Sequence, residues 1–366
     1  MTAAAQNQWM SERAAPPVPR GPLIWLRANL FSSPLNVALT FLSLAFLYLI
    51  VPPLLDWAVF DAAWRGSRIE DCPDREAACW VFVQARWPNL LYGSYPAPER
   101  WRIDLVFALG ALGVTLLMLP RVPRKGWIGA ALLSAYPLVA FVLLIGGAFG
   151  LRHLPTTEWG GLMLTVVAAT WAIVTSIPLG LLLALGRRSP KRLIRWFCIG
   201  FIEFWRGVPL IAVLFLAVVM FPLFVPPGLE FDKLLRALVA FSLFNAAYMA
   251  EVFRGGLQSV PAGQYEAARA VGLGYFRMMT FVILPQAVRV SLPALVNTCI
   301  GIFKETTLIL VIGLFDLLAA IQAGMADPAW LAGEHVRTSG YVFAAFGFWV
   351  FCYGMSRYSR MLERRL

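Results

Sequence analysis

Long segments without any charged residue dominate this sequence. A helix needs about 20 apolar residues to cross about 30 Å of hydrocarbon, and 60% of the 366 residues are hydrophobic whereas 14% are charged. Flanking aromatic and arginine side chains extend the shorter segments. The segments are residues 28–55, 105–120, 128–151, 159–186, 207–229, 237–250, 290–303 and 338–356. They predict an all-α polytopic membrane protein.

The positions of the basic residues predict how the chain crosses the membrane. Cytoplasmic loops carry an excess of Lys and Arg. Four such clusters occur, within residues 20–27, 121–125, 187–195 and 357–365. Placing all four inside puts both termini in the cytoplasm and leaves acid-rich loops outside. We expect about eight transmembrane helices, near residues 36–55, 103–120, 128–150, 161–186, 205–226, 236–256, 286–313 and 339–357.

The net charge of +11 has two interpretations. A basic protein often binds nucleic acid, but the positive-inside bias accounts for the charge of a membrane protein without it, so we expect no nucleic-acid partner. The first apolar segment follows about 30 more polar residues and is too long for the core of a signal peptide. Residues 1–35 are therefore expected to form a cytoplasmic N-terminal arm.

The cysteines and histidines indicate little chemistry. Cys72 and Cys79 share a loop expected outside, where a disulfide is permitted; a bridge and two unpaired thiols both remain open. The only two histidines, His153 and His335, lie near outside loops, so they form no metal or catalytic cluster. A phosphate-binding loop of the form Gly-x4-Gly-Lys-Ser/Thr is absent from the sequence. We therefore expect no catalysis, metal or cofactor in this chain, and a membrane enzyme is disfavoured.

A short polar helix is expected between two apolar segments, in "QSVPAGQYEAARAVGLGYFRMMTFVILPQAVRV" (258–290). Ser259 suits a helix cap, and Pro261 suits the first turn. Gly272 is placed to end the helix in a left-handed turn, and a second helix would begin near Tyr275. Pro285 would lie within that helix, where a kink is tolerated. Small alanines leave room for a partner to approach, although an ordinary surface helix also fits these residues.

The spacing of this segment resembles the EAA loop of ABC-importer permeases. Glu266-Ala267-Ala268, Gly272 and Leu284-Pro285 match that loop, and Val282 stands where isoleucine is commoner. The segments "IEFWRGVPLI", "FNAAYMAEVFRGGLQSVPAGQYEAARAVG", "LPQAVRVSLPALVN" and "FKETTLI" are similar to the polar amino-acid (histidine/glutamine-type) branch of that family. The first 155 residues resemble the N-terminal extension of the larger membrane subunit of general L-amino-acid or glutamate/glutamine importers.

The resemblance implies a type I (MetI-like) permease core of five helices in residues 156–366. Residues 36–155 would form a three-helix extension with a periplasmic loop at 56–101. It also implies a bacterial inner membrane, a second related permease subunit, two cytoplasmic ATPase subunits that hold ATP and Mg, and a periplasmic binding protein that delivers an L-amino acid. The loop 258–285 would carry the coupling helix. Its coupling residues would be Tyr265, Glu266, Ala267, Ala268, Arg269, Gly272 and Pro285.

Polar residues at or near the ends of the apolar segments are candidates for the substrate pathway. Ionisable groups in a bilayer are costly unless they are paired or hydrated. The candidates are Asn245, Glu251, Asn297, Lys304, Glu305, Thr306 and Thr307. Alternatively, Glu251 pairs with Arg254, three residues further along the same helix face.

A stand-alone secondary transporter or channel is the main alternative function. The "KETT" sequence at 304–307 would break or bend a long helix, which fits that class. Such carriers commonly contain internal repeats, and we find none here. Dependence of transport on ATP, rather than on an ion gradient, would separate the two functions.

Overall fold

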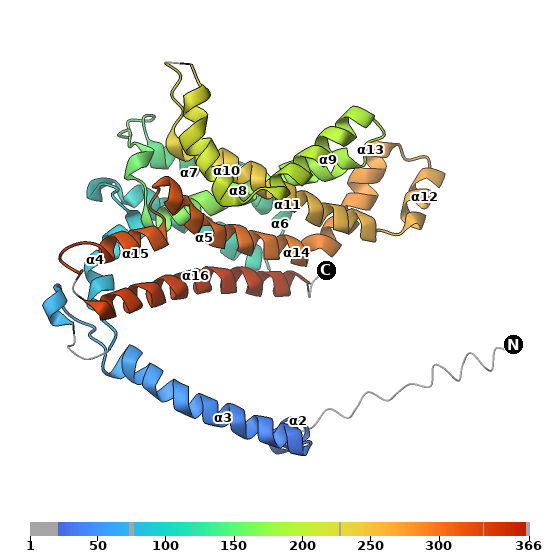
Figure 1. The fold of residues 1–366 in the computed structure, drawn as a ribbon. Coiled ribbons are helices and arrows are strands. Elements are labelled where there is room, and N and C mark those ends of the chain that lie inside the picture. The colour runs from blue at the N-terminus through green and yellow to red at the C-terminus, as the bar shows by residue number, and fades with distance from the viewer. Residues whose placement is uncertain (1–20, 73–76, 120, 227, 332, 364–366) are drawn as a thin grey trace. The chain divides into compact units, whose positions relative to one another are not determined.

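The computed structural model describes residues 21–72, 77–119, 121–226, 228–331 and 333–363. As the sequence predicts, these residues form helices and no strand (Figure 1). The chain divides into two compact units, Met1–Ala63 with Cys72–Ala78, and Trp64–Asp71 with Cys79–Leu366. The second unit contains the five-helix core together with the other two predicted helices of the N-terminal extension.

The first unit contains the first predicted span. It comprises α2 (Pro22–Asn29), α3 (Pro34–Leu55) and a π-helical turn, η1 (Asp56–Phe60). Ser33 begins α3 because its hydroxyl accepts a hydrogen bond from the Asn36 amide at 3.2 Å, and Pro34 occupies the first turn, where no amide hydrogen is needed. Together α3 and η1 give an apolar stretch of 27 residues, long enough to cross a membrane.

The first elements of the second unit are η2 (Ile69–Asp71), α4 (Val81–Tyr92), η3 (Ala97–Glu99), α5 (Trp101–Met118), α6 (Lys125–Leu133), α7 (Ala135–Ile145) and η4 (Thr156–Glu158). The helices α6 and α7 meet at Ser134 and count together as one candidate span. Cys198, Cys299 and Cys352 are free.

The remaining helices follow the predicted five-span order. They are α8 (Gly161–Arg187), α9 (Arg192–Gly207), α10 (Leu210–Phe215), α11 (Lys233–Ser259), α12 (Ala262–Ala270), α13 (Tyr275–Met278), α14 (Leu284–Glu305), α15 (Leu317–Met325) and α16 (Glu334–Glu363). Short π- or 3-10-helical turns are η5 (Leu216–Met220), η6 (Phe221–Phe224), η7 (Met279–Ile283) and η8 (Thr306–Ile312).

Small residues bring α8 and α11 together at the centre of this unit. A methyl group added at Gly180 would lie 2.5 Å from Met249 Cβ and 3.0 Å from Ala246 O. Ala246 and Ala250 are fully buried. Small side chains let helix backbones approach closely in membrane proteins, so this pair forms the frame from which α12 extends.

Six helices of the described residues are long and apolar enough to span a membrane, or seven if one bent pair counts as a span. That pair is α9 with α10–η6, and the two parts are bent by 103°. The sequence instead predicts a single span at 205–226. Pro209 explains the bend because it disfavours helix at the preceding Val208. The eighth predicted span corresponds to α16, which is not among the seven. Its 30 residues are long enough, but Ser, Gly, Tyr and Trp dilute its apolar residues.

Candidate functional site

The short polar helix predicted from the sequence is α12 (Ala262–Ala270), which follows α11 directly. Figure 1 shows it beyond the end of α11, next to α13. Pro261 occupies the N-cap position without a side-chain cap. The predicted cap, Ser259, is instead the last residue of α11, and its hydroxyl donates to Gly256 O at 2.8 Å. Val260 and Pro261 are extended, so they separate the two helices.

Gly272 ends α12 in the predicted left-handed turn, with φ of 78°. The Leu273 amide donates to Ala268 O at 3.0 Å, and the Gly272 amide donates to Arg269 O at 2.9 Å. This pair of bonds is a Schellman motif, which satisfies carbonyls at a helix end. The turn fixes the direction in which the chain leaves α12 and enters α13.

Arg188, the residue after α8, anchors α12 to the core. Its Nη1 donates to the Tyr265 hydroxyl at 3.0 Å and to Leu257 O at 3.3 Å. The guanidinium carbon lies 5.5 Å from the centre of the Tyr265 ring, within the range of a cation–π interaction. The Tyr265 hydroxyl also lies 3.3 Å from Leu257 O, to which it donates. One arginine therefore joins the ends of α8 and α11 to α12.

A second contact anchors α12 to α14. Gln286 Nε2 donates to Gln264 Oε1 at 3.1 Å. Pro285 lies in the first turn of α14, directly after the π-helical turn η7, so the kink expected at this proline is a change of helix type. Gln264 and Tyr265 both lie in the first half of α12, so this half of the helix is held to α8, α11 and α14.

The two faces of α12 differ in exposure. Ala268 is 4% exposed and belongs to the apolar core, and Tyr265 is half-buried. In contrast, Glu266, Ala267 and Arg269 are exposed. A partner could therefore contact the last three directly, whereas Ala268 and Tyr265 hold the helix on its own subunit.

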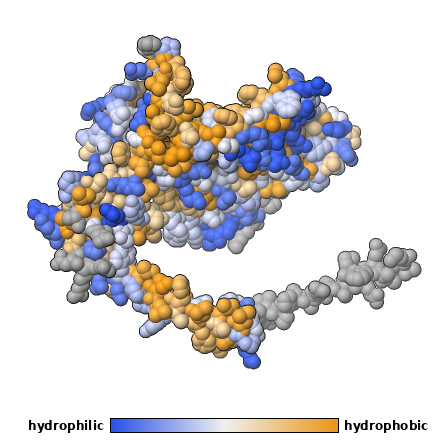
Figure 2. Space-filling view, viewed as in Figure 1, coloured by the Kyte–Doolittle hydropathy of each residue, from blue (hydrophilic) through white to orange (hydrophobic). Residues whose placement is uncertain are grey.

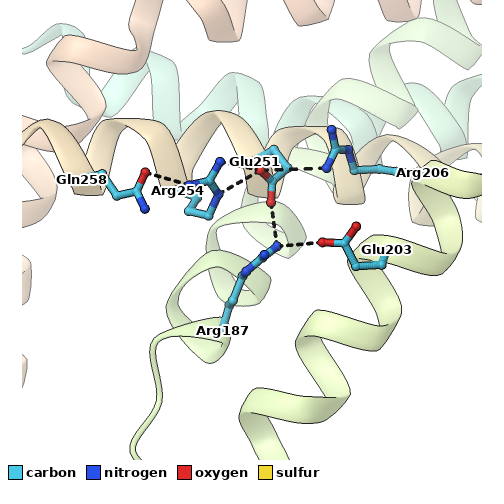
Figure 3. A network of polar contacts seen from close by, with 6 residues as sticks. All are labelled: Arg187, Glu203, Arg206, Glu251, Arg254 and Gln258. Atoms are coloured by element: carbon cyan, nitrogen blue, oxygen red, sulfur yellow. Dashed lines mark hydrogen bonds and ion pairs between the residues drawn. The ribbon is translucent and has the colours of Figure 1, made fainter.

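An ion-pair cluster lies where α8, α9 and α11 meet (Figure 3). The Glu251 carboxylate is 2.8 Å from both Arg187 Nη1 and Arg254 Nη2, and 3.9 Å from Arg206 Nη1. Arg187 also lies 3.3 Å from Glu203. The Glu251 side chain is 17% exposed, so its charge is largely shielded from solvent and depends on these arginines.

The pairing of Glu251 with Arg254 confirms the alternative that the sequence left open. The sequence does not predict the contact with Arg187, because Arg187 belongs to a basic cluster that indicates only the orientation of the chain. No sequence spacing indicates that residues 187 and 251 meet. Glu251 remains a candidate for the substrate pathway, but the contacts described here bind it to arginines of its own subunit.

The structure brings together two of the other pathway candidates. Asn245 is 2% exposed; its Nδ2 donates to Phe241 O at 3.0 Å, and its side chain interacts with that of Glu305. Glu305 Oε2 is buried, and within the described residues it makes no hydrogen bond. A buried, incompletely satisfied carboxylate beside an amide is a polar site that a cationic group could occupy.

The remaining candidates lie near the break predicted at 304–307, where α14 changes into the 3-10 helix η8 after Glu305. Thr306 Oγ1 donates to Phe303 O at 2.8 Å, and Thr307 Oγ1 donates to Lys304 O at 3.0 Å. Such bonds to the preceding turn accompany local changes in a helix. Lys304 and Asn297 are exposed.

Comparisons with known proteins find similar membrane transport proteins. A model of the binding-protein-dependent transport system inner membrane component matches residues 176–366. The chain is 48% identical to the inner membrane amino-acid ABC transporter permease protein YhdY of Escherichia coli, over 94% of this chain and 92% of YhdY. It is 35% identical to the glutamate/glutamine/aspartate/asparagine transport system permease protein BztC of Rhodobacter capsulatus, over 100% of this chain and 98% of BztC.

The chain is also similar to a solved structure titled as a crystal structure of an amino acid ABC transporter with histidines. The match covers 56% of this chain and 92% of the chain in that structure, at 30% identity and a TM-score of 0.49. The match to residues 176–366 includes α9 to α16 and therefore the whole of α12. The chain belongs to the family of binding-protein-dependent transport system inner membrane components.

Proposed function

We propose that this permease imports L-amino acids that a periplasmic binding protein delivers, and that ATP hydrolysis on separate subunits drives the import. The names of YhdY and BztC support amino acids as the substrate class. Both alignments extend through the N-terminal helices as well as the core. The substrate class therefore rests on relatives with the same long architecture.

Energy coupling is proposed to pass through α12, and this helix is the observation that carries the proposal. Its exposed residues Glu266, Ala267 and Arg269 would contact an ATPase subunit. Tyr265 and Ala268 would hold it to the permease, while Gly272 and Pro285 would set the path of the chain. A compact helix in a partner's groove is a common recognition mode. The contacts of Tyr265 with Arg188 and of Gln264 with Gln286 would let a displacement of α12 move α8 and α14.

The proposed assembly contains two cytoplasmic ATPase subunits that hold ATP and Mg, a second and related permease, and the binding protein on the outer side. Both termini of this chain would lie in the cytoplasm of a bacterium. The basic residues around Arg188, which contacts α12, support that orientation, because Arg187 ends α8 and Arg188, Lys191, Arg192 and Arg195 follow it. Such residues favour the cytoplasmic side.

The polar residues around Asn245 and Glu305 are proposed to contribute to the substrate pathway, together with Asn297, Lys304, Thr306 and Thr307. An amino-acid zwitterion needs an acceptor for its ammonium group and donors for its carboxylate. Glu305 supplies the first, and Asn245 and Lys304 supply the second. Glu251 would stand at the cytoplasmic end of this region, within the arginine cluster.

Purification of the intact complex from membranes, followed by reconstitution into vesicles, tests the proposed function. We expect ATPase subunits and a second permease to copurify, and amino-acid uptake to require both ATP and a binding protein. Uptake that an ion gradient alone drives would instead establish a secondary transporter. A Glu305→Gln variant should lower the amino-acid stimulation of ATP hydrolysis; an unchanged response to every amino acid would remove Glu305 from the pathway.

A further inference from the structure

A large apolar cavity separates the N-terminal helices α5 and α7 from the core helices α8 and α11. Its volume is about 410 Å³, within the range of small-molecule sites. Phe107, Ala140, Val167, Trp171 and Leu238 line it, one or more from each of the four helices. All four helices belong to segments that are long and apolar enough to span a bilayer.

The cavity opens onto the outer surface of these helices. Two of its lining residues, Phe141 and Leu235, are 50% and 41% exposed, so the apolar lining continues onto the outside of the helices. Water does not fill an apolar cavity, and an empty cavity of this size loses the contacts of every atom that lines it. An acyl chain from the surrounding bilayer would fill the cavity with apolar atoms, because it is apolar and always present.

Polar side chains gather at one end of the cavity. His153, Thr156 and Thr157 come from the loop before α8, and Asp232 comes from the start of α11. Thr156 Oγ1 donates to one Asp232 oxygen at 2.5 Å, and the other oxygen caps α11 by accepting from the Leu235 amide at 2.9 Å. The deeper Tyr136 is already satisfied, since its hydroxyl donates to Val106 O at 3.1 Å.

This polarity matches one phospholipid molecule lying along the cavity. We propose that the cavity binds an acyl chain of a phospholipid whose headgroup carries an ammonium group, as phosphatidylethanolamine does. The Asp232 carboxylate would attract the ammonium group, and the Thr157 hydroxyl and His153 ring supply donors for the phosphate. The lipid would fill the space between the N-terminal helices and the core, whatever the chain transports.

Photo-crosslinking of the intact complex in vesicles tests this site. Two probes with the same diazirine-bearing acyl chain are compared, one with an ethanolamine and one with a glycerol headgroup. The variant Ala140→Phe fills the cavity. Its matched control, Ala135→Phe, places the same ring at an exposed position of the same helix. Asp232→Asn removes the charge but keeps an oxygen that caps α11 equally well.

The ethanolamine probe should label the segments around residues 140 and 167 several-fold more than the glycerol probe. Ala140→Phe should abolish the excess at 167, and Ala135→Phe should leave it unchanged. Asp232→Asn should make the two probes equal while acyl labelling persists. The proposal would be overturned if these segments were labelled no more than the exposed face of α3. It would also be overturned if both phenylalanine variants lost labelling equally.

Discussion

Arg188 Nη1 donates a hydrogen bond to the Tyr265 hydroxyl at 3.0 Å, across 77 positions of sequence. The same guanidinium group lies over the Tyr265 ring and also donates to Leu257 O. The ends of α8 and α11 therefore meet α12 at one side chain. A movement of α12 would be passed to α8 and α11 through this contact.

Replacing Arg188 should weaken coupling more than folding. Lysine keeps the charge but loses the planar group that stacks and donates in two directions, so Arg188→Lys should lower amino-acid uptake per ATP hydrolysed several-fold. Tyr265→Phe, which removes about 0.5–1.5 kcal/mol of hydrogen bonding, should have a smaller effect. Arg192→Lys, at an exposed position of α9, is the control. If the ratio of uptake to hydrolysis is the same in all three variants, Arg188 does not transmit movement.

Gly272→Val should impair transport because a β-branched residue resists a φ of 78°. The cost of the left-handed conformation is about 1–2 kcal/mol. Space is not the reason, since an added methyl group at Gly272 would meet no atom within 4 Å. Gly274→Val is the matched control, because that position also faces open space but has φ of −67°. Uptake that falls equally in both variants would contradict the role assigned to the turn.

Glu251→Gln should destabilise the permease by about 1.5–3 kcal/mol, the usual contribution of hydrogen bonds to a charged group. The substitution leaves Arg187 and Arg254 without the carboxylate that neutralises them. Glu203→Gln should cost under about 1 kcal/mol, because the Glu203 side chain is 57% exposed. Thermal unfolding of both variants in the same detergent measures the difference. Equal unfolding temperatures would show that the cluster is not organised around Glu251.

The stability of the permease should fall between about pH 4 and pH 6 because of Asp316. Burial raises the pKa of this carboxyl group to about 6, although its oxygen accepts a bond from the Ala319 amide. The folded state therefore binds the proton more tightly than the unfolded state does. Its stabilising contribution is present below pH 3.8 and is lost as the pH rises through 6.

The rise in the pKa of Asp316 from 3.8 to about 6 corresponds to about 3 kcal/mol in the free energy of unfolding. Asp316→Asn retains a cap for α15 and should flatten this part of the stability profile. Unfolding temperatures measured from pH 4 to pH 7 provide the test. If the unfolding temperature of the variant depends on pH as steeply as that of the natural protein, another group is responsible for the dependence.

The order of the helices could be predicted from the sequence because a helix that spans a membrane requires a long segment without charged residues. The end of α12 could also be predicted, because glycine is the residue that most readily adopts the left-handed conformation at a helix end. The start of α12 could not. Ser259 and Pro261 both fit a helix start, and the choice depended on α11 continuing through Ser259.

Contacts between distant segments could not be predicted. Arg188 and Tyr265, or Arg187 and Glu251, meet only because α8 and α11 pack through Gly180 and small alanines. The bend between α9 and α10 was missed for a different reason. The apolar segment at 207–229 continues through Pro209, so the composition does not indicate a break. The proline nevertheless changes the direction of the helix.

The central claim, that α12 is the element an ATPase subunit contacts, is tested most directly by site-specific crosslinking. A single cysteine is introduced at Ala267, which is exposed on α12, or at Ala326, which is exposed after α15. A short crosslinker is then added to the complex in inverted membranes. The account predicts that Ala267→Cys joins the permease to an ATPase subunit with a yield that changes on ATP binding, and that Ala326→Cys does not. Labelling of Ala267→Cys by an impermeant maleimide from outside intact cells would contradict it.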